Sequence, residues 1–306
     1  MSGARLWIVT GKGGVGKTTV AAALAHAASA EGETVLVVEV AKPGRLASAL
    51  DVSPLASTPS EVRPGVWAAA PDEEDSLTRL IEGLLPLRLL SRRLLASDSF
   101  QAICAAIPGI TEAALLARLL GWLEHDDRTL PAFDRVILDA PASGHSLPLL
   151  ATPDALLRMV NVGPLGELLR RCRRQLTDPE RTRALVVALP EDWAVAEAIE
   201  LRERLREETA VALARPVLNG VVTRRFSRAE EEKLATAQSE GRVDPTMLAA
   251  AQWFRERRDN DVAFTRRLRE GTGERPLELP RLFTSRLGWN EIGTLSAPLA
   301  REFVHG

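Results

Sequence analysis

Gly11-Lys12-Gly13-Gly14-Val15-Gly16-Lys17-Thr18-Thr19 is the stretch that indicates the fold of this 306-residue chain. Its spacing, G-x-x-x-x-G-K-T, is that of a phosphate-binding loop (P-loop), in which glycines let backbone N–H groups curl around a β-phosphate. In such a loop the Lys17 ammonium reaches the β/γ oxygens and the Thr18 hydroxyl is left for Mg²⁺. Residues 6–10 read as a short buried strand, and the residues from Lys17 onward read as a helix whose N-terminus faces the phosphates. We therefore predict a strand, a P-loop and a helix here, in preference to a glycine-rich turn without a ligand.

Lys12 adds a second lysine to the loop, one residue after its first glycine. This placement resembles the deviant Walker A loop of the family that includes ArsA, MinD, ParA and the nitrogenase iron protein. The resemblance implies that Lys12 reaches across a dimer interface to the partner's nucleotide. The chain has only four lysines, and two of them lie in this loop, where a compact ammonium fits the phosphate cradle better than a planar guanidinium does.

A second motif begins where an apolar run ends in Asp139. An acid that ends a buried strand is typical of a Walker B site, where Asp139 accepts a hydrogen bond from a Mg²⁺-bound water. The sequence from Asp139 onward is D-A-P-A-S-G-H, which resembles the switch II signature of the ArsA branch, and the Gly144 N–H is a candidate donor to the γ-phosphate. Pro108-Gly109-Ile110-Thr111-Glu112-Ala113 resembles the P-G-I-x-E-A signature of ArsA and of the ATPase that targets tail-anchored proteins. We therefore expect the P-loop to bind ATP, and Thr18 and Asp139 to hold Mg²⁺.

Residues 34–39 are predicted to form the second strand, and the loop after it corresponds to switch I. Relatives that resemble this chain carry an aspartate there that positions the attacking water, and alignment with them places Ala41 at that aspartate. A methyl group cannot orient water, so Glu39 is the alternative candidate for this role. The candidate catalytic residues are Lys12, Lys17 and Glu39, and we expect slow hydrolysis because loss of a water-positioning group costs ~10²–10⁴-fold in rate.

The adenine end of the site is predicted from residues 216–222, a strand that is followed by Thr223 and Arg224. Relatives resembling this chain usually carry Asn there, followed by Arg, Lys or Gln, to read the adenine edge. Thr223 has one hydroxyl in place of a two-sided amide, so Asn219, inside the strand, is the fallback reader. Residues 277–286 are predicted to give a last strand and a loop whose backbone covers the adenine in the family.

Residues 71–124 are rich in leucine and are predicted to be helical. Two interpretations stay open. In the first, these helices pack on the domain and on each other, as apolar helical stripes usually do. In the second, Leu84, Leu89 and Leu119 line an exposed apolar groove for a partner or client.

Composition limits the class of protein. Hydrophobic residues make up 45% of the chain, and no apolar run approaches the ~20 residues of a membrane span. The N-terminus leads directly into the first strand without room for a signal peptide, so we expect one cytoplasmic domain over residues 1–306 with no membrane span.

A net charge of −2 argues against a nucleic-acid partner, and basic clusters at 170–174 and 255–269 favour solvated helix faces. Cys104 and Cys172 form no CxxC pair, so neither a disulfide framework nor a zinc site is indicated.

Together the motifs resemble the ArsA branch over most of the chain. The resemblance implies an α/β P-loop NTPase: a mostly parallel sheet flanked by helices, with a leucine-rich helical insertion at about residues 71–124. The leading hypothesis is an ATPase with ATP and Mg²⁺ as cofactors that dimerises around nucleotide, as a homodimer or with a paralogue, and serves a transport or targeting partner such as a membrane protein or another hydrophobic client. The alternative is a nucleotide-binding regulatory subunit with little turnover, paired with an active paralogue. Two isolated cysteines argue against arsenite capture, and Met159 and Met247, the only internal methionines, argue against a methionine-lined client groove.

Overall fold

The computed structural model describes the chain except for residues 1–2, 41–43, 85–106, 285 and 305–306. Its centre is a mixed sheet in which the strand order is β3-β4-β2-β5-β1-β6-β8-β9, with the short β7 paired to β6. Only β3, which runs antiparallel to β4, departs from a parallel arrangement among the described strands. The strands are β1 (Leu6–Gly11), β2 (Val35–Glu39), β3 (Ser60–Arg63), β4 (Val66–Ala69), β5 (Arg135–Asp139), β6 (Thr182–Ala188), β7 (Ala212–Leu213), β8 (Val217–Val221) and β9 (Leu277–Pro280).

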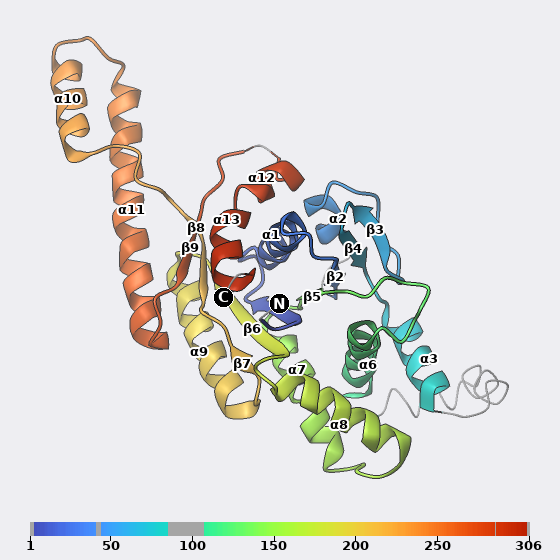
Figure 1. Cartoon of the computed structure of the whole chain (residues 1–306). Helices are drawn as coiled ribbons and strands as arrows, with labels where there is room; N and C mark the ends of the chain where they lie inside the picture. Colours follow the sequence, from blue (N-terminus) through green and yellow to red (C-terminus); the bar gives the residue numbers. More distant parts are fainter. Residues whose placement is uncertain (1–2, 41–43, 85–106, 285, 305–306) are drawn as a thin grey trace.

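Helices cover both faces of this sheet. Figure 1 shows α1, α12 and α13 on one side and α6, α7, α8 and α9 on the other. The helices are α1 (Lys17–Ala30), α2 (Arg45–Ala49), α3 (Glu73–Leu84), α6 (Ile110–Glu124), α7 (Ser143–Leu157), α8 (Gly163–Thr177), α9 (Asp192–Glu208), α10 (Arg228–Ser239), α11 (Pro245–Thr272), α12 (Trp289–Gly293), α13 (Ser296–Leu299) and the π-helical turn η1 (Ala300–Val304).

The central strand β1 shows how the two faces are built. Leu6 and Ile8 pack in the apolar cluster that contains α6, α8 and α9. Trp7 and Val9 point to the opposite face and pack in the cluster that contains α1 and the C-terminal helices. Side chains alternate between the faces of a strand, so a strand covered on both sides reads as a continuous apolar run. This explains why residues 6–10 carry no polar alternation.

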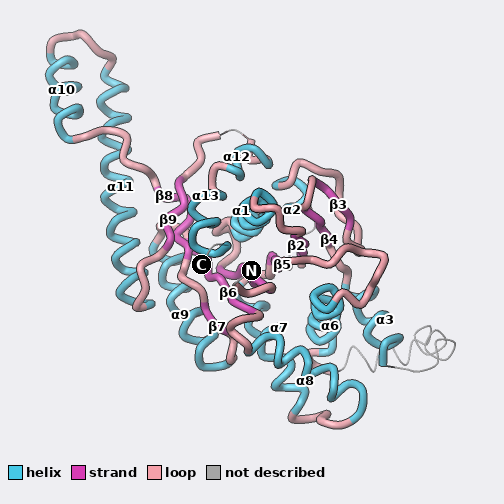
Figure 2. Tube along the Cα trace, viewed as in Figure 1, coloured by secondary structure: helices cyan, strands magenta, loops and turns pink. Residues whose placement is uncertain are grey.

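The pair α10 and α11 departs from the layered arrangement. The C-terminal part of α11 packs against α9, whereas α10 and the first turns of α11 extend away from the sheet as an arm (Figures 1 and 2). Helix α11 is fastened at the end of β8, because the buried carboxylate of Asp261 in its second half accepts a hydrogen bond from Val222 N at 2.7 Å. Several arginines of the basic cluster at 255–269 form ion pairs, among them Arg255 with Glu231 and Arg267 with Asp192.

The predicted fold class, a mostly parallel sheet flanked by helices, is confirmed. Strand β6 begins at Thr182, where it pairs with Leu6 of β1, and the buried Thr182 hydroxyl donates to Gln175 O at 2.6 Å. The antiparallel strand β3, just before β4, was not predicted from the sequence. No helix within the described residues combines the length and apolar character needed to cross a bilayer.

The described part of the leucine-rich region consists of α3 and α6. Leu80 and Leu119 are buried, and Leu84 is partly buried against the small cluster around Leu80. For Leu119, the structure therefore supports the core interpretation. Leu89, which was predicted with them, lies outside the described residues.

Candidate functional site

The loop between β1 and α1 has a backbone shape that requires glycine. Gly14 and Gly16 have φ angles of 91° and 89°, a left-handed conformation that side chains disfavour. At Gly11 a Cβ atom would lie 2.3 Å from the carbonyl oxygen of Val187 on β6. The loop therefore curls tightly and leaves its backbone N–H groups accessible to a ligand, while Val15 turns its side chain into the core.

Lys17 occupies the middle of this curl. Its ammonium donates to Gly11 O at 3.1 Å and to Lys12 O at 3.0 Å, and its side chain is almost fully buried. Burial lowers the pKa of Lys17, although Asp139 acts in the opposite direction. A cation held in this position faces the space that a phosphate would occupy.

Thr18 and Asp139 meet at the mouth of the loop. The Thr18 hydroxyl donates to Asp139 Oδ2 at 2.6 Å, and Asp139 Oδ1 is buried with no hydrogen-bond partner. Burial raises the pKa of Asp139 to about 6, and the hydrogen bond from Thr18 only partly offsets this. A hydroxyl beside an unsatisfied carboxylate oxygen fits the oxygen ligands that Mg²⁺ prefers. Since the described residues contain no cluster of three or more His, Cys, Asp or Glu side chains suited to a metal, further ligands would come from nucleotide and water.

The segment after β5 places a second helix N-terminus beside the loop. Thr10 on β1 donates to the Ser146 hydroxyl at 2.7 Å and so fixes the start of α7. Gly144 lies in the first turn of α7 and is exposed, so its N–H is one of the donors that a helix N-terminus leaves without an intrahelical partner. Such N–H groups favour bound anions.

These elements enclose a cavity of about 900 Å³. That volume is within the range of small-molecule and cofactor sites. The residues that line it come from the P-loop, from α2, from the segment after β5 and from the loop before α12: Gly13, Gly14, Gly16, Lys17, Thr18, Thr19, Gly44, Arg45, Ser48, Ala49, Asp139, Pro141, Ala142, His145 and Leu287. Asp139 is the one carboxylate among the described residues that line it.

Glu39 lies next to Asp139 across the paired strands β2 and β5, but its carboxylate is engaged elsewhere. Its two oxygens accept hydrogen bonds from Gly44 N at 3.0 Å and Leu46 N at 2.8 Å. Glu39 thus accepts from two N–H groups at the start of α2. Ala41, which the sequence aligns with the water-positioning aspartate, lies outside the described residues.

The residues predicted at the adenine end are not brought together. Thr223 and Arg224 are exposed, do not line the cavity, and the Arg224 Nε donates to Phe226 O at 3.1 Å. Asn219 lies against the P-loop, where its Nδ2 donates to Val15 O at 2.9 Å. Leu287 supplies an apolar contact at this side of the cavity.

Lys12 does not point into the cavity. Its ammonium lies 3.0 Å from Glu197 Oε2 and 5.4 Å from the centre of the Trp193 ring, both on α9 of the same chain. Sequence reasoning missed Glu197 and Trp193 because they belong to no motif and reach the loop only through the fold. Sequence reasoning also missed Arg45, which lines the cavity. Arg45 follows the carboxyl end of a parallel strand, where open α/β sheets bind ligands, and this position could have indicated it.

The sequence of this chain is similar to those of known ATPases. The family model for anion-transporting ATPases matches residues 4–164. The chain is similar to the ATPase BagA of Mycobacterium tuberculosis, with 30% identity over 257 residues that cover 82% of this chain and 74% of that protein. It is also 30% identical to an arsenical pump-driving ATPase of Acidiphilium multivorum over 253 residues, 74% of this chain and 41% of that protein. An ATPase ASNA1 homolog of Cryptosporidium parvum is 24% identical over 249 residues, covering 71% of this chain and 65% of that protein.

Proposed function

Because this chain belongs to the anion-transporting ATPase family, we propose that it is a Mg²⁺-dependent ATPase that closes around ATP as a dimer and uses that closure to act on a partner. The observation that carries the proposal is the pairing of Thr18 with Asp139 at 2.6 Å beside a buried, unpartnered carboxylate oxygen. It supports an arrangement in which the P-loop binds the phosphates and these two residues hold Mg²⁺. When bound, the metal would neutralise phosphate charge during hydrolysis.

The roles of the other site residues follow from their positions. Lys17 holds the β- and γ-phosphate oxygens from inside the curl, and the Gly144 N–H at the start of α7 donates to the γ-phosphate. Lys12 would act in the closed form, across the interface with a second copy or a paralogue, as its position in the family implies.

The partner surface is proposed on the side of the sheet that carries α3, α6 and α8. A cavity of about 920 Å³ lies among these helices, with apolar residues such as Leu80, Leu84 and Leu168 in its wall. The residues that line it also include Arg79, Glu82 and other charged side chains, so it suits a partner with both apolar and polar groups.

A second candidate function is a nucleotide-binding regulatory subunit with little turnover of its own. Two observations favour it: Asp139 is the single carboxylate among the described cavity-lining residues, and the Glu39 carboxylate is engaged with Gly44 N and Leu46 N. Neither leaves a free base for the attacking water. Under this function the chain would bind ATP and close, while an active paralogue performs hydrolysis.

One experiment separates these functions. Purified full-length chain is assayed for phosphate release with Mg²⁺-ATP and, in parallel, for mass by light scattering with a non-hydrolysable ATP analogue. Turnover that depends on Mg²⁺ and is lost in Asp139→Ala supports the ATPase. Analogue-dependent dimerisation without turnover supports the regulatory subunit, and the absence of nucleotide binding would exclude both.

A further inference from the structure

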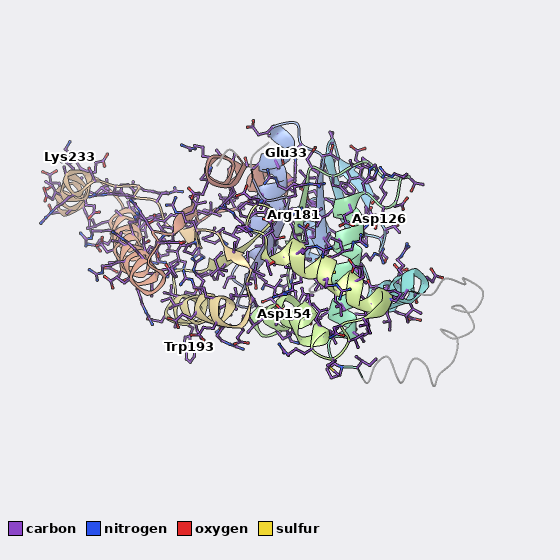
Figure 3. The ribbon with its side chains drawn as sticks, turned by 60° about the horizontal axis from the view of Figure 1, so that its bottom comes forward. Glu33, Asp126, Asp154, Arg181, Trp193 and Lys233 are labelled. Atoms are coloured by element: carbon purple, nitrogen blue, oxygen red, sulfur yellow. The ribbon has the colours of Figure 1, made fainter. Side chains whose placement is uncertain are left out.

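Lys12 is held by α9 of its own chain through two contacts. The ammonium forms an ion pair with Glu197 at 3.0 Å and lies over the ring of Trp193 at 5.4 Å. Trp193 is 80% exposed, and Figure 3 shows it pointing outward from α9. An exposed tryptophan beside the P-loop lysine therefore marks the surface on which Lys12 lies.

The same Glu197 side chain also reaches the segment after β5. Its second oxygen, Oε1, accepts a hydrogen bond from the Ser143 hydroxyl at 2.6 Å. Ser143 is the first residue of α7, immediately before Gly144, the proposed γ-phosphate donor. A single carboxylate thus links the P-loop lysine to the N-terminus of α7, two elements that belong to different parts of the nucleotide site.

The geometry points to Glu197 as a positioning residue: it holds Lys12 and Ser143 together in the open chain, and Lys12 leaves it for the phosphates bound to a second copy when the dimer closes. This inference rests on the proposed nucleotide-dependent dimer. In this structure the Lys12 ammonium lies against Glu197 and Trp193, both on α9 of its own chain, so on this proposal Lys12 turns away from α9 to reach a phosphate bound by a second copy. When Lys12 leaves, the Glu197 carboxylate loses one of its two partners, so closure is communicated to Ser143 and the start of α7.

The ion pair between Lys12 and Glu197 is weak enough for Lys12 to exchange Glu197 for a phosphate. The side chains of Lys12 and Glu197 are 38% and 31% exposed, so solvent screens their attraction. Partly exposed ion pairs of this kind change an equilibrium by only about two- to fivefold. Glu197 therefore biases the chain toward the open form without preventing closure, which a nucleotide phosphate can drive.

The inference is tested on the full-length chain with Mg²⁺ and the non-hydrolysable ATP analogue AMP-PNP. Analytical sedimentation measures the protein concentration at which half of the molecules are dimeric. Glu197→Gln is expected to lower that concentration about two- to fivefold, because it weakens the open form alone. Glu200→Gln removes the same charge from the same helix at a residue that does not pair with Lys12, and is expected to change nothing. In a Lys12→Ala background, Glu197→Gln is expected to have no effect on dimerisation.

A spectroscopic measurement reports the open form directly. The chain's tryptophan fluorescence minus that of Trp193→Phe gives the emission of Trp193 alone. In the nucleotide-free chain the ring of Trp193 faces the Lys12 ammonium. Glu197→Gln without nucleotide is expected to shift this difference toward that of Lys12→Ala, and Glu197→Asp to restore part of it. AMP-PNP is expected to cause the same shift in the parent chain.

The outcomes are distinguishable. If Glu197→Gln matches Glu200→Gln, or if its effect persists in the Lys12→Ala background, Glu197 has a merely structural role and the inference is overturned. A parent chain that stays monomeric with AMP-PNP overturns the proposed dimer, and this inference with it. Melting curves identify any variant that has lost its fold. If Glu197→Gln does not fold, the dimerisation and the Trp193 emission of Glu197→Asp are compared with those of the parent chain to test the inference.

Discussion

Asn219 on β8 donates from Nδ2 to Val15 O in the P-loop at 2.9 Å, across a sequence separation of 204 residues. The approach depends on glycine, because a Cβ at Gly16 would lie 2.3 Å from that nitrogen. This bond uses one of the two N–H groups of the Asn219 amide. Asn219 therefore links strand β8 to the conformation of the loop, and its position argues for a role in shaping the phosphate site.

Asn219→Ala is predicted to lower ATP affinity about two- to tenfold, because one hydrogen bond that supports the loop contributes about 0.5–1.5 kcal/mol. The loss should be equal for ATP, GTP and inorganic pyrophosphate, since only the phosphate site changes. Isothermal titration calorimetry measures all three. If Asn219→Ala instead lowers the affinity for ATP alone, Asn219 reads the adenine. Thr223→Ala tests Thr223, the other candidate adenine reader, in the same way.

Lys17→Ala is predicted to abolish measurable ATP binding by calorimetry. The ammonium of Lys17 lies inside the curl of the loop, bonded to Gly11 O and Lys12 O, and no other described cation is placed there. Cys172→Ser is the control, because Cys172 is buried on α8 and does not line the cavity. Unchanged ATP affinity in Lys17→Ala would show that the loop does not bind phosphate.

The sequence predicts the parts of this site that are local. The P-loop and Asp139 follow from short patterns, because strand, turn and helix dictate where their backbone N–H groups and side chains point. The structure adds partners that no spacing reveals: Asn219 against Val15, and Glu197 against Lys12. Such contacts depend on which strands neighbour one another, and strand order is a property of the whole fold.

The same distinction applies to the elements. Apolar strands in the middle of the parallel sheet, such as β1 and β2, were predictable because all of their residues are buried. The antiparallel β3 was not, since its residues Ser-Glu-Val-Arg alternate weakly and it pairs only at the sheet edge. The arm formed by α10 and α11 was also missed as a unit, because its helices are charged on most sides.

The nucleotide-free chain is predicted to lose stability as pH rises from 4 to 6, through Asp139. Its pKa in the folded chain is about 6, above the ordinary value of 3.8, so the folded state binds a proton more tightly than the unfolded state does. Two pKa units correspond to roughly 3 kcal/mol, and the deficit is complete above pH 6. Asp139→Asn should therefore melt at a higher temperature than the parent at pH 7.5 and at a similar one at pH 4. Melting curves in EDTA measure this, and equal temperatures at pH 7.5 would contradict it.

Leu119→Ala is predicted to lower the free energy of unfolding by about 2–5 kcal/mol, because Leu119 is 1% exposed within the main core. Leu84→Ala, at a partly buried position in the cavity beside α3, should cost less than Leu119→Ala. Urea unfolding of the two variants measures the difference. The core interpretation of Leu119 fails if its variant keeps parental stability and instead loses a bound partner.

The last prediction concerns hydrolysis. Ala41→Asp is predicted to raise kcat by at least about 10²-fold, because it supplies the carboxylate that orients the attacking water in relatives resembling this chain. Ala41→Asn is the matched control, since an amide has a similar size but is a far weaker proton acceptor.

Glu39→Gln tests the other candidate. In this structure Glu39 accepts from Gly44 N and Leu46 N, and a glutamine can accept through only one of its two end atoms. If Glu39 only caps α2, the variant should weaken ATP binding while kcat stays near the parental value. If Glu39 also positions the water, kcat should fall as well, by ~10²-fold or more. Rapid turnover by the parent chain, together with no gain from Ala41→Asp and no loss from Glu39→Gln, would show that neither residue holds the position of the water-orienting group.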